Sequence, residues 1–121
     1  MKKIIALIIA LVSLPALAGQ WVQVPGWTVK VKVNPVALEN MLWEYIHKES
    51  RLVFQPRESY TYQYKAITDT EILINALCEV KDKELLEKKF IQVFDGGSCY
   101  FQAKYNFELK KVTNLVVNGE A

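Results

Sequence analysis

Residues 27–50 read WTVKVKVNPVALENMLWEYIHKES, and this stretch decides the fold because the spacing of its apolar residues changes part-way along. Apolar and polar side chains alternate over residues 27–33, which predicts a half-buried β-strand. Asn34 and Pro35 predict a helix start, since asparagine caps helices and proline is tolerated at the first helical position. From there to about Ser50 apolar residues recur at helical spacing, so we expect a long helix that buries one face: Leu38, Met41, Leu42, Tyr45 and Ile46.

Most of the remaining chain has the patterns of β-strands and turns. Six segments alternate or are rich in apolar residues, and we expect them to be extended: residues 20–24, 58–67, 71–80, 90–94, 98–106 and 111–117. Thr68-Asp69-Thr70 predicts the turn of an antiparallel hairpin, and Asp95-Gly96-Gly97 predicts a tight hairpin turn. The charged residues 81–89 predict a short surface helix or, as the alternative, a plain loop.

This order of elements predicts an α+β fold. We expect one long helix packed on a curled antiparallel sheet of about five strands, with one disulfide. The order is similar to that of cystatin-like folds. Cystatins carry a Gln-x-Val-x-Gly loop in a hairpin after the helix, and no segment there matches it. The similarity therefore implies a fold and no cystatin activity.

The first residues have the pattern of a secretion signal. Lys2 and Lys3 precede an apolar run over residues 4–12, and Ala16-Leu17-Ala18 supplies the small residues of a cleavage site. A membrane anchor is the alternative, but Ser13 and Pro15 interrupt the run well short of the ~20 apolar residues that span a bilayer. We therefore expect residues 1–18 to be a signal peptide, and residues 19–121 to form one domain that has no stable membrane insertion after cleavage.

The predicted compartment is the periplasm or the outside of the cell. No cysteine lies near the predicted cleavage site, so we expect no lipid anchor. The full chain has 15 Lys and Arg against 13 Asp and Glu; without Lys2 and Lys3 the basic count is also 13, and the mature domain is formally neutral. A neutral domain gives no reason to expect a nucleic-acid partner, which needs a clustered excess of positive charge.

Cys78 and Cys99 are the two cysteines of the chain. An even cysteine count in an exported protein indicates a disulfide rather than a metal site or a redox centre. We predict that these two residues are bonded to each other.

No set of residues predicts catalysis, a metal site or a cofactor. His47 is the only histidine, and its spacing from Leu38 places it on the side of the helix opposite the buried face. Ser98 lies in Gly96-Gly97-Ser98-Cys99, which lacks the second glycine of a nucleophile elbow. We therefore expect a protein that is not an enzyme and that holds neither metal nor cofactor.

The most distinctive surface candidate is aromatic. Tyr60, Tyr62 and Tyr64 share one face of a predicted strand, and Trp21 and Trp27 lie near the predicted mature N-terminus. If their side chains are exposed, these five residues predict a binding surface for another protein or a glycan. The alternative is that the tyrosine face covers the helix and that its hydroxyls reach the rim of the sheet.

Two functions remain after these exclusions. The first is a protein-binding module, acting as an inhibitor, immunity factor or accessory subunit, whose partner is another envelope or extracellular protein. Its contact surface is the aromatic face or a sheet edge. The second is a carrier of a small apolar or sugar ligand, bound between Met41 and Tyr45 of the helix and the sheet.

Overall fold

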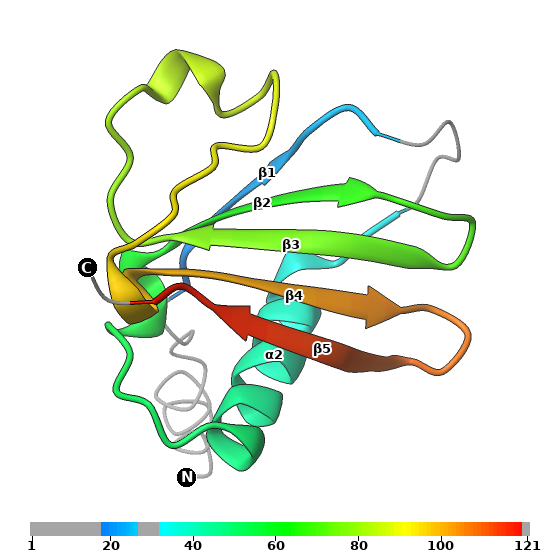
Figure 1. Cartoon of the computed structure of the whole chain (residues 1–121). Helices are drawn as coiled ribbons and strands as arrows, with labels where there is room; N and C mark the ends of the chain where they lie inside the picture. Colours follow the sequence, from blue (N-terminus) through cyan, green and yellow to red (C-terminus); the bar gives the residue numbers. More distant parts are fainter. Residues whose placement is uncertain (1–17, 27–31, 120–121) are drawn as a thin grey trace, which may run out of the picture.

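The computed structural model describes residues 18–26 and 32–119 (Figure 1). Within these residues one α-helix lies on one face of a five-stranded sheet whose strand order is β1-β2-β3-β4-β5. The elements are β1 (Gln20–Gln23), α2 (Pro35–Glu49), β2 (Thr61–Ala66), β3 (Glu71–Leu77), β4 (Tyr100–Asn106) and β5 (Lys111–Val117). Three single turns of 3-10 helix are added at Arg57–Ser59, Lys83–Leu85 and Gly97–Cys99. The predicted α+β class is confirmed.

Helix α2 begins and ends where its sequence predicts. The side chain of Asn34 accepts a hydrogen bond from the backbone N–H of Ala37 at 3.2 Å, and Pro35 is the first helical residue. At the other end the N–H of Ser50 donates to the carbonyl of Ile46 at 2.9 Å. The buried side chains of α2 recur at helical spacing: Leu38, Glu39, Leu42, Trp43 and Ile46.

The sheet is mixed, so the prediction of a wholly antiparallel sheet is wrong at one pair. Strands β2 to β5 form an antiparallel meander, but β1 pairs with β2 in parallel, with Gln20 opposite Thr61 and Gln23 opposite Tyr64. Parallel neighbours need a long crossover connection, usually a helix. Helix α2 lies between β1 and β2 in the chain and makes this connection. The curl and the cystatin-like order remain predictions.

The predicted strand at residues 90–94 is also wrong, and so is the hairpin predicted at 95–97. This segment lies against the sheet face opposite α2, where amide side chains bind its backbone, and it does not join an edge. Gly96 and Gly97 do adopt positive φ angles, of 94° and 59°. They lead into a 3-10 turn rather than a hairpin, and the strand that follows starts at Tyr100.

Two further predictions have different outcomes. Residues 81–89 contain only the single 3-10 turn Lys83–Leu85, so neither a regular helix nor a wholly plain loop describes them. Residues 27–31 of the strand predicted at 27–33 lie outside the described residues, as do residues 1–17 of the predicted signal peptide, and Lys32 and Val33 are not in a strand. No helix within the described ranges is long and apolar enough to span a membrane.

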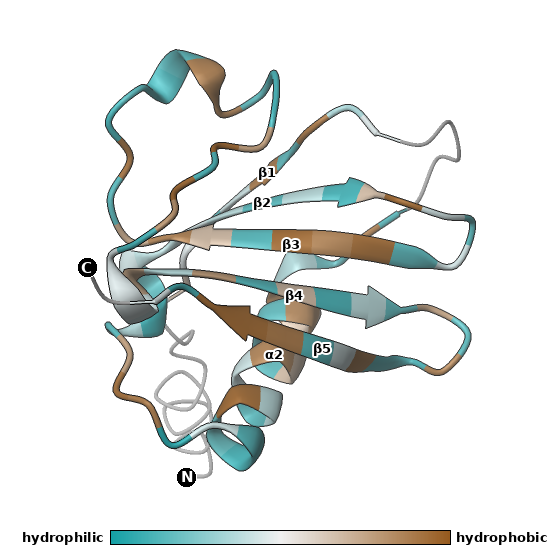
Figure 2. Cartoon of the chain, viewed as in Figure 1, coloured by the Kyte–Doolittle hydropathy of each residue, from teal (hydrophilic) through white to brown (hydrophobic). Residues whose placement is uncertain are grey.

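The core lies between α2 and the sheet face that α2 covers. Figure 2 shows hydrophobic residues along the centre of β3, at the C-terminal half of β5 and on α2. The buried cluster contains Leu38, Leu42, Trp43, Ile46, Tyr60, Tyr62, Ile72, Ile74, Ala76, Phe101, Ala103, Tyr105 and Val112. Helix and sheet are therefore joined through apolar and aromatic side chains.

Candidate functional site

The structure buries most of the tyrosine face that the sequence singles out. Tyr60 and Tyr62 are 1% and 0% exposed, and Tyr64 is partly buried. The predicted exposed aromatic surface is therefore wrong at Tyr60 and Tyr62, and the alternative, a face that covers the helix, describes them. Because both side chains contact the core rather than solvent, neither offers a surface to a partner.

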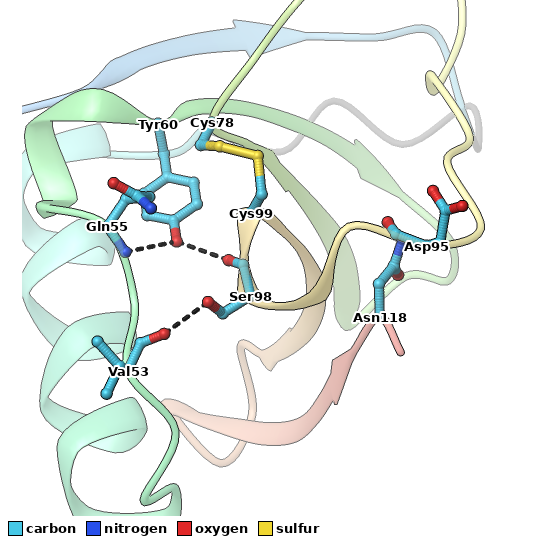
Figure 3. The surroundings of a disulfide bond; sticks show 8 residues. All are labelled: Val53, Gln55, Tyr60, Cys78, Asp95, Ser98, Cys99 and Asn118. Carbon is cyan, nitrogen blue, oxygen red and sulfur yellow. Dashed lines mark hydrogen bonds between the residues drawn. A yellow bond between two sulfur atoms is a disulfide. The ribbon is translucent and has the colours of Figure 1, made fainter. Parts of the chain in front are cut away.

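Each buried tyrosine hydroxyl both donates and accepts a hydrogen bond. Tyr60 donates to the carbonyl of Ser98 at 2.6 Å and accepts from the N–H of Gln55 at 3.1 Å (Figure 3). The other hydroxyl, of Tyr62, lies 2.7 Å from the carbonyl of Arg57 and accepts from Nε1 of Trp43 at 2.8 Å.

Burial raises the pKa of both phenols, so they stay neutral well above neutral pH. The two hydroxyls therefore hold loops in place and are not available for binding.

The remaining predicted aromatic residues have separate outcomes. Trp21 on β1 is partly buried and stacks on Tyr62, with ring centroids 4.6 Å apart and an interplanar angle of 15°. Its ring centroid is also 5.9 Å from that of Tyr64. Trp27 lies outside the described residues. The structure thus brings Trp21, Tyr62 and Tyr64 together, but mainly as packing between β1 and β2.

The disulfide is confirmed. Cys78 and Cys99 are bonded, their Cα atoms are 5.0 Å apart, and the N–H of Cys78 donates to the carbonyl of Cys99 at 2.8 Å. Cys78 follows β3 directly and Cys99 precedes β4 directly, so the bond closes the ends of these two neighbouring strands (Figure 3). Ser98 is part of the same corner, because its hydroxyl donates to the carbonyl of Val53 at 2.5 Å.

Three amide side chains form a row across the outer face of the sheet, which we call the amide row: Gln63, Asn75 and Gln102. They lie on β2, β3 and β4 and are in register with one another. Asn75 Nδ2 donates to Gln63 Oε1 at 2.9 Å, and Gln102 Nε2 donates to Asn75 Oδ1 at 3.3 Å. Gln63 and Asn75 are only 0% and 4% exposed.

The amide row binds the backbone of residues 78–99, which we call the covering segment. Gln63 Nε2 donates to the carbonyls of Leu86 and Lys89 at 2.9 and 2.8 Å, and its Oε1 accepts from the N–H of Ile91 at 2.9 Å. Asn75 Nδ2 donates to the carbonyl of Ile91 at 2.9 Å. The covering segment is thus held to the sheet by side-chain amides and by the disulfide at its ends.

One polar residue on the buried side of α2 is absent from the sequence-based predictions. Glu39 is 0% exposed, and its carboxylate accepts three hydrogen bonds of 2.9 Å, from the N–H of Gly19, from Nε1 of Trp21 and from Nε of Arg57. We call these four residues the Glu39 cluster. The signal for it was present in the sequence, because Glu39 has the same helical spacing as the core residue Ile46, seven positions later.

A groove runs between α2 and strand β5. Its volume is about 650 Å³, it is open to solvent, and its lining residues are Met41, Glu44, Tyr45, Lys48, Glu49, Leu109, Lys110, Lys111, Val112 and Thr113. Met41 and Tyr45 are partly buried against the core and give the groove an apolar part. The exposed Glu44, Lys48 and Lys110 place charges of both signs around it. We call it the α2–β5 groove.

The sheet side of this groove is an edge strand. β5 is the last strand in the sheet order, and no strand in the described part of the chain pairs with its outer side. Figure 1 shows α2 crossing behind β4 and β5, with its C-terminal turns extending past β5. Val112 pairs with Tyr105 and Asn114 pairs with Lys104, which leaves Thr113 as the extra residue of a β-bulge.

The residues considered for catalysis or metal binding include His47, and Cys78 and Cys99 are bonded to each other. His47 is exposed on α2, with its ring centroid 5.8 Å from that of Trp43. Over residues 18–26 and 32–119 no group of three or more His, Cys, Asp or Glu side chains could hold a metal ion. Comparison with known proteins found no matching family model, no matching curated protein and no matching solved structure.

Proposed function

We propose that this protein is an exported, non-enzymatic binding module that holds an extended segment of another protein in the α2–β5 groove. The observation that carries this proposal is the position of β5, a seven-residue edge strand that forms one wall of an open groove and whose outer side pairs with no strand among the described residues. An edge strand presents a row of backbone N–H and C=O groups that a further strand can bind.

The groove adds selectivity for side chains, which backbone pairing at a strand edge does not provide. Backbone hydrogen bonds give affinity for any extended segment, whereas pockets beside the edge select its side chains. Met41 and Tyr45 offer apolar contact to side chains on one side of an added strand. Glu44, Lys48 and Lys110 offer partners to charged groups at the rim. The preferred segment is therefore extended, with alternating apolar and charged residues.

Export is part of the proposal and has two supports. The lysines and apolar run of residues 1–18 have the pattern of a signal peptide. The Cys78–Cys99 disulfide fits an oxidising compartment, the periplasm or the outside of the cell. The partner is then an envelope or extracellular protein, for which the chain acts as an inhibitor, immunity factor or accessory subunit.

A proline at Thr113 tests the edge-strand contact. Proline removes a backbone donor from an edge strand but is tolerated at bulges, so Thr113→Pro is expected to fold and to lose partner binding. Thr113→Val keeps the N–H and is the matched control. A photo-crosslinking residue placed at Leu109, which is 58% exposed and lines the groove, reports binding in the native envelope.

The expected result is one crosslinked protein with the wild-type groove and with Thr113→Val, and none with folded Thr113→Pro. A second crosslinker at Val36, which is 62% exposed and does not line the groove, measures background. The same adduct at Leu109 with Thr113→Pro, or an equal adduct at Val36, contradicts strand addition to β5.

A small-ligand carrier is the second candidate, because the α2–β5 groove has Met41 and Tyr45 in its wall. Its volume of about 650 Å³ is within the range of ligand sites, roughly 300–1,000 Å³. Such sites usually enclose their ligand, whereas this groove is open, which favours an extended segment. Native mass spectrometry of protein purified from the envelope separates the two: a carrier retains a small molecule, and Met41→Trp displaces it while Thr113→Pro does not.

A further inference from the structure

The Glu39 cluster contains the backbone nitrogen of Gly19, the residue that directly follows the predicted cleavage motif. Glu39 Oε1 accepts from the N–H of Gly19 and from Nε1 of Trp21, both at 2.9 Å, while Oε2 accepts from Nε of Arg57 at 2.9 Å. The carboxylate is 0% exposed, and the Arg57 side chain, at 29%, is the one charged group among its three donors. The buried anion thus lies beside the nitrogen of the Ala18–Gly19 peptide bond.

Gly19 is held in a position that only glycine fits. A Cβ atom added there would lie 2.5 Å from the carbonyl oxygen of Tyr60 and 2.5 Å from the ring of Tyr62. Real Cβ atoms do not approach other atoms this closely, so any side chain forces the backbone away from Glu39. Residue 19 is therefore closely packed against Tyr60 and Tyr62, although it follows the predicted cleavage motif Ala16-Leu17-Ala18 directly.

We propose that the Ala18–Gly19 bond is the maturation site and that cleavage makes the Gly19 α-ammonium the second cation of the Glu39 cluster. This inference rests on the proposed export of the chain. A signal peptidase adds water across the bond: the C–N bond breaks, Ala18 keeps the carboxylate, and the Gly19 nitrogen leaves as an amine that is protonated at neutral pH. The neutral N–H donor becomes a charged one at the same place.

The charge change strengthens an existing hydrogen bond. The bond from the Gly19 amide to the carboxylate already has an ionised acceptor, and an ammonium donor adds the attraction between two opposite charges, which is screened less in a buried site than in water. Arg57 is a like charge that opposes the ammonium, but it binds Oε2, whereas Gly19 binds Oε1. The mature chain is therefore more stable than a chain whose Gly19 nitrogen remains an amide.

The test compares two forms of residues 19–121, one with a free Gly19 amine and one with that amine acetylated. We expect the free amine to lower the unfolding constant in urea about tenfold, which corresponds to about 1.4 kcal/mol. In Glu39→Gln the same comparison should give less than a twofold difference. Equal stability of the two wild-type forms, or a tenfold difference that persists in Glu39→Gln, overturns the proposal.

A second measurement covers the case in which Glu39→Gln does not fold. The reaction of the Gly19 amine with an amine-reactive reagent at pH 7 should be at least tenfold slower in the folded protein than in urea, because the ammonium binds Glu39. An amine that reacts equally fast in both states contradicts the proposed contact.

The mass of the exported protein separates this inference from the proposal of export. A mature chain that begins at Gly19 supports both. A chain that keeps residues 1–18 refutes the maturation site, and its recovery from the cytoplasm alone refutes export as well. Cleavage at a different bond leaves export standing and refutes the role assigned to Gly19.

Discussion

Replacing Gln63 by leucine tests whether the amide row holds the covering segment against the sheet. Gln63 is 0% exposed, and its side chain makes four hydrogen bonds of 2.8 to 2.9 Å, which use both of its amide hydrogens and two acceptor positions. Leucine is similar in size but makes none of them. The substitution therefore removes polar contacts and leaves the packing volume nearly unchanged.

The size of the effect follows from the partners that lose their bonds. These partners are the carbonyls of Leu86 and Lys89, the N–H of Ile91 and one hydrogen of the Asn75 amide. A buried polar group without a partner costs about 1 to 3 kcal/mol, so four of them cost about 4 kcal/mol at the lower bound if the segment stays in place. Lifting of the segment rehydrates them, and we therefore expect a loss of about 2 to 4 kcal/mol.

Hydrogen exchange with the disulfide intact measures this loss locally. An opening free energy lowered by 2 to 4 kcal/mol speeds exchange of the amides in residues 83–93 by about 30- to 700-fold. Trypsin cleavage after Lys83 and Lys88 should rise in parallel. Gln102→Leu is the matched control, because Gln102 makes one longer bond, of 3.3 Å to Asn75, and should change exchange about tenfold at most.

The comparison of Gln63→Leu with Gln102→Leu tests whether Gln63 holds the covering segment against the sheet. If the amide hydrogens of the covering segment exchange at the same rate in both variants, the position of the segment does not depend on Gln63. The disulfide and apolar packing of residues such as Leu86, which is 7% exposed, would then hold the segment.

Three other outcomes follow from the structure. Cys78→Ser with Cys99→Ser should lower the free energy of unfolding by about 3 kcal/mol, the loop-closure value for a separation of 21 residues, and an unchanged urea midpoint would contradict it. Burial raises the pKa of Tyr62 above its usual value near 10. Above pH 10 the unfolded chain releases this proton while the folded chain keeps it, so the free energy of unfolding should be at its full value below pH 10 and fall above it. Tyr62→Phe should reduce the slope of the free energy of unfolding against pH in that range. Gly19→Ala should cost about 1 to 3 kcal/mol through overpacking, whereas Gly119→Ala, whose Cβ meets no atom within 4 Å, should cost nothing measurable in the same denaturation assay.

Features fixed by local sequence were predictable. Helix α2 has its cap, its proline and its apolar spacing within residues 34–50, and the structure places it at Pro35–Glu49. The strand predicted at residues 111–117 has the same bounds in the structure, and the cysteine pairing follows from a count of two. In each case a short stretch or a simple count carries the signal.

Features that depend on distant partners were not predictable. Residues 90–94 are apolar enough for a strand, but the backbone of Ile91 binds Gln63 and Asn75, which lie 28 and 16 residues away. The sequence of β1 likewise does not state the direction in which it pairs, since this depends on the path of α2. A period-2 pattern identifies an extended segment, not the groups that its backbone binds.

The residues of the candidate site also depend on partners that are distant in the sequence. Alternating tyrosines have the same sequence pattern whether the side chains are exposed or buried. Burial of Tyr60 and Tyr62 is possible because backbone carbonyls accept hydrogen bonds from their hydroxyls. Tyr60 finds one at Ser98, 38 residues away. Glu39 shows the reverse case, because a carboxylate on an apolar helix face is unfavourable until Arg57, Trp21 and Gly19 bind it.

The distribution of these polar contacts supports the α2–β5 groove as the proposed binding site. Glu39 and Trp43 bind α2 to β1, β2 and the turn before β2, and the disulfide joins the ends of β3 and β4. Within the described residues no hydrogen bond or ion pair links the side chains of the last α2 turns to β5. A partner strand that enters this groove therefore breaks no side-chain hydrogen bond or ion pair between these elements, which supports the proposed binding there.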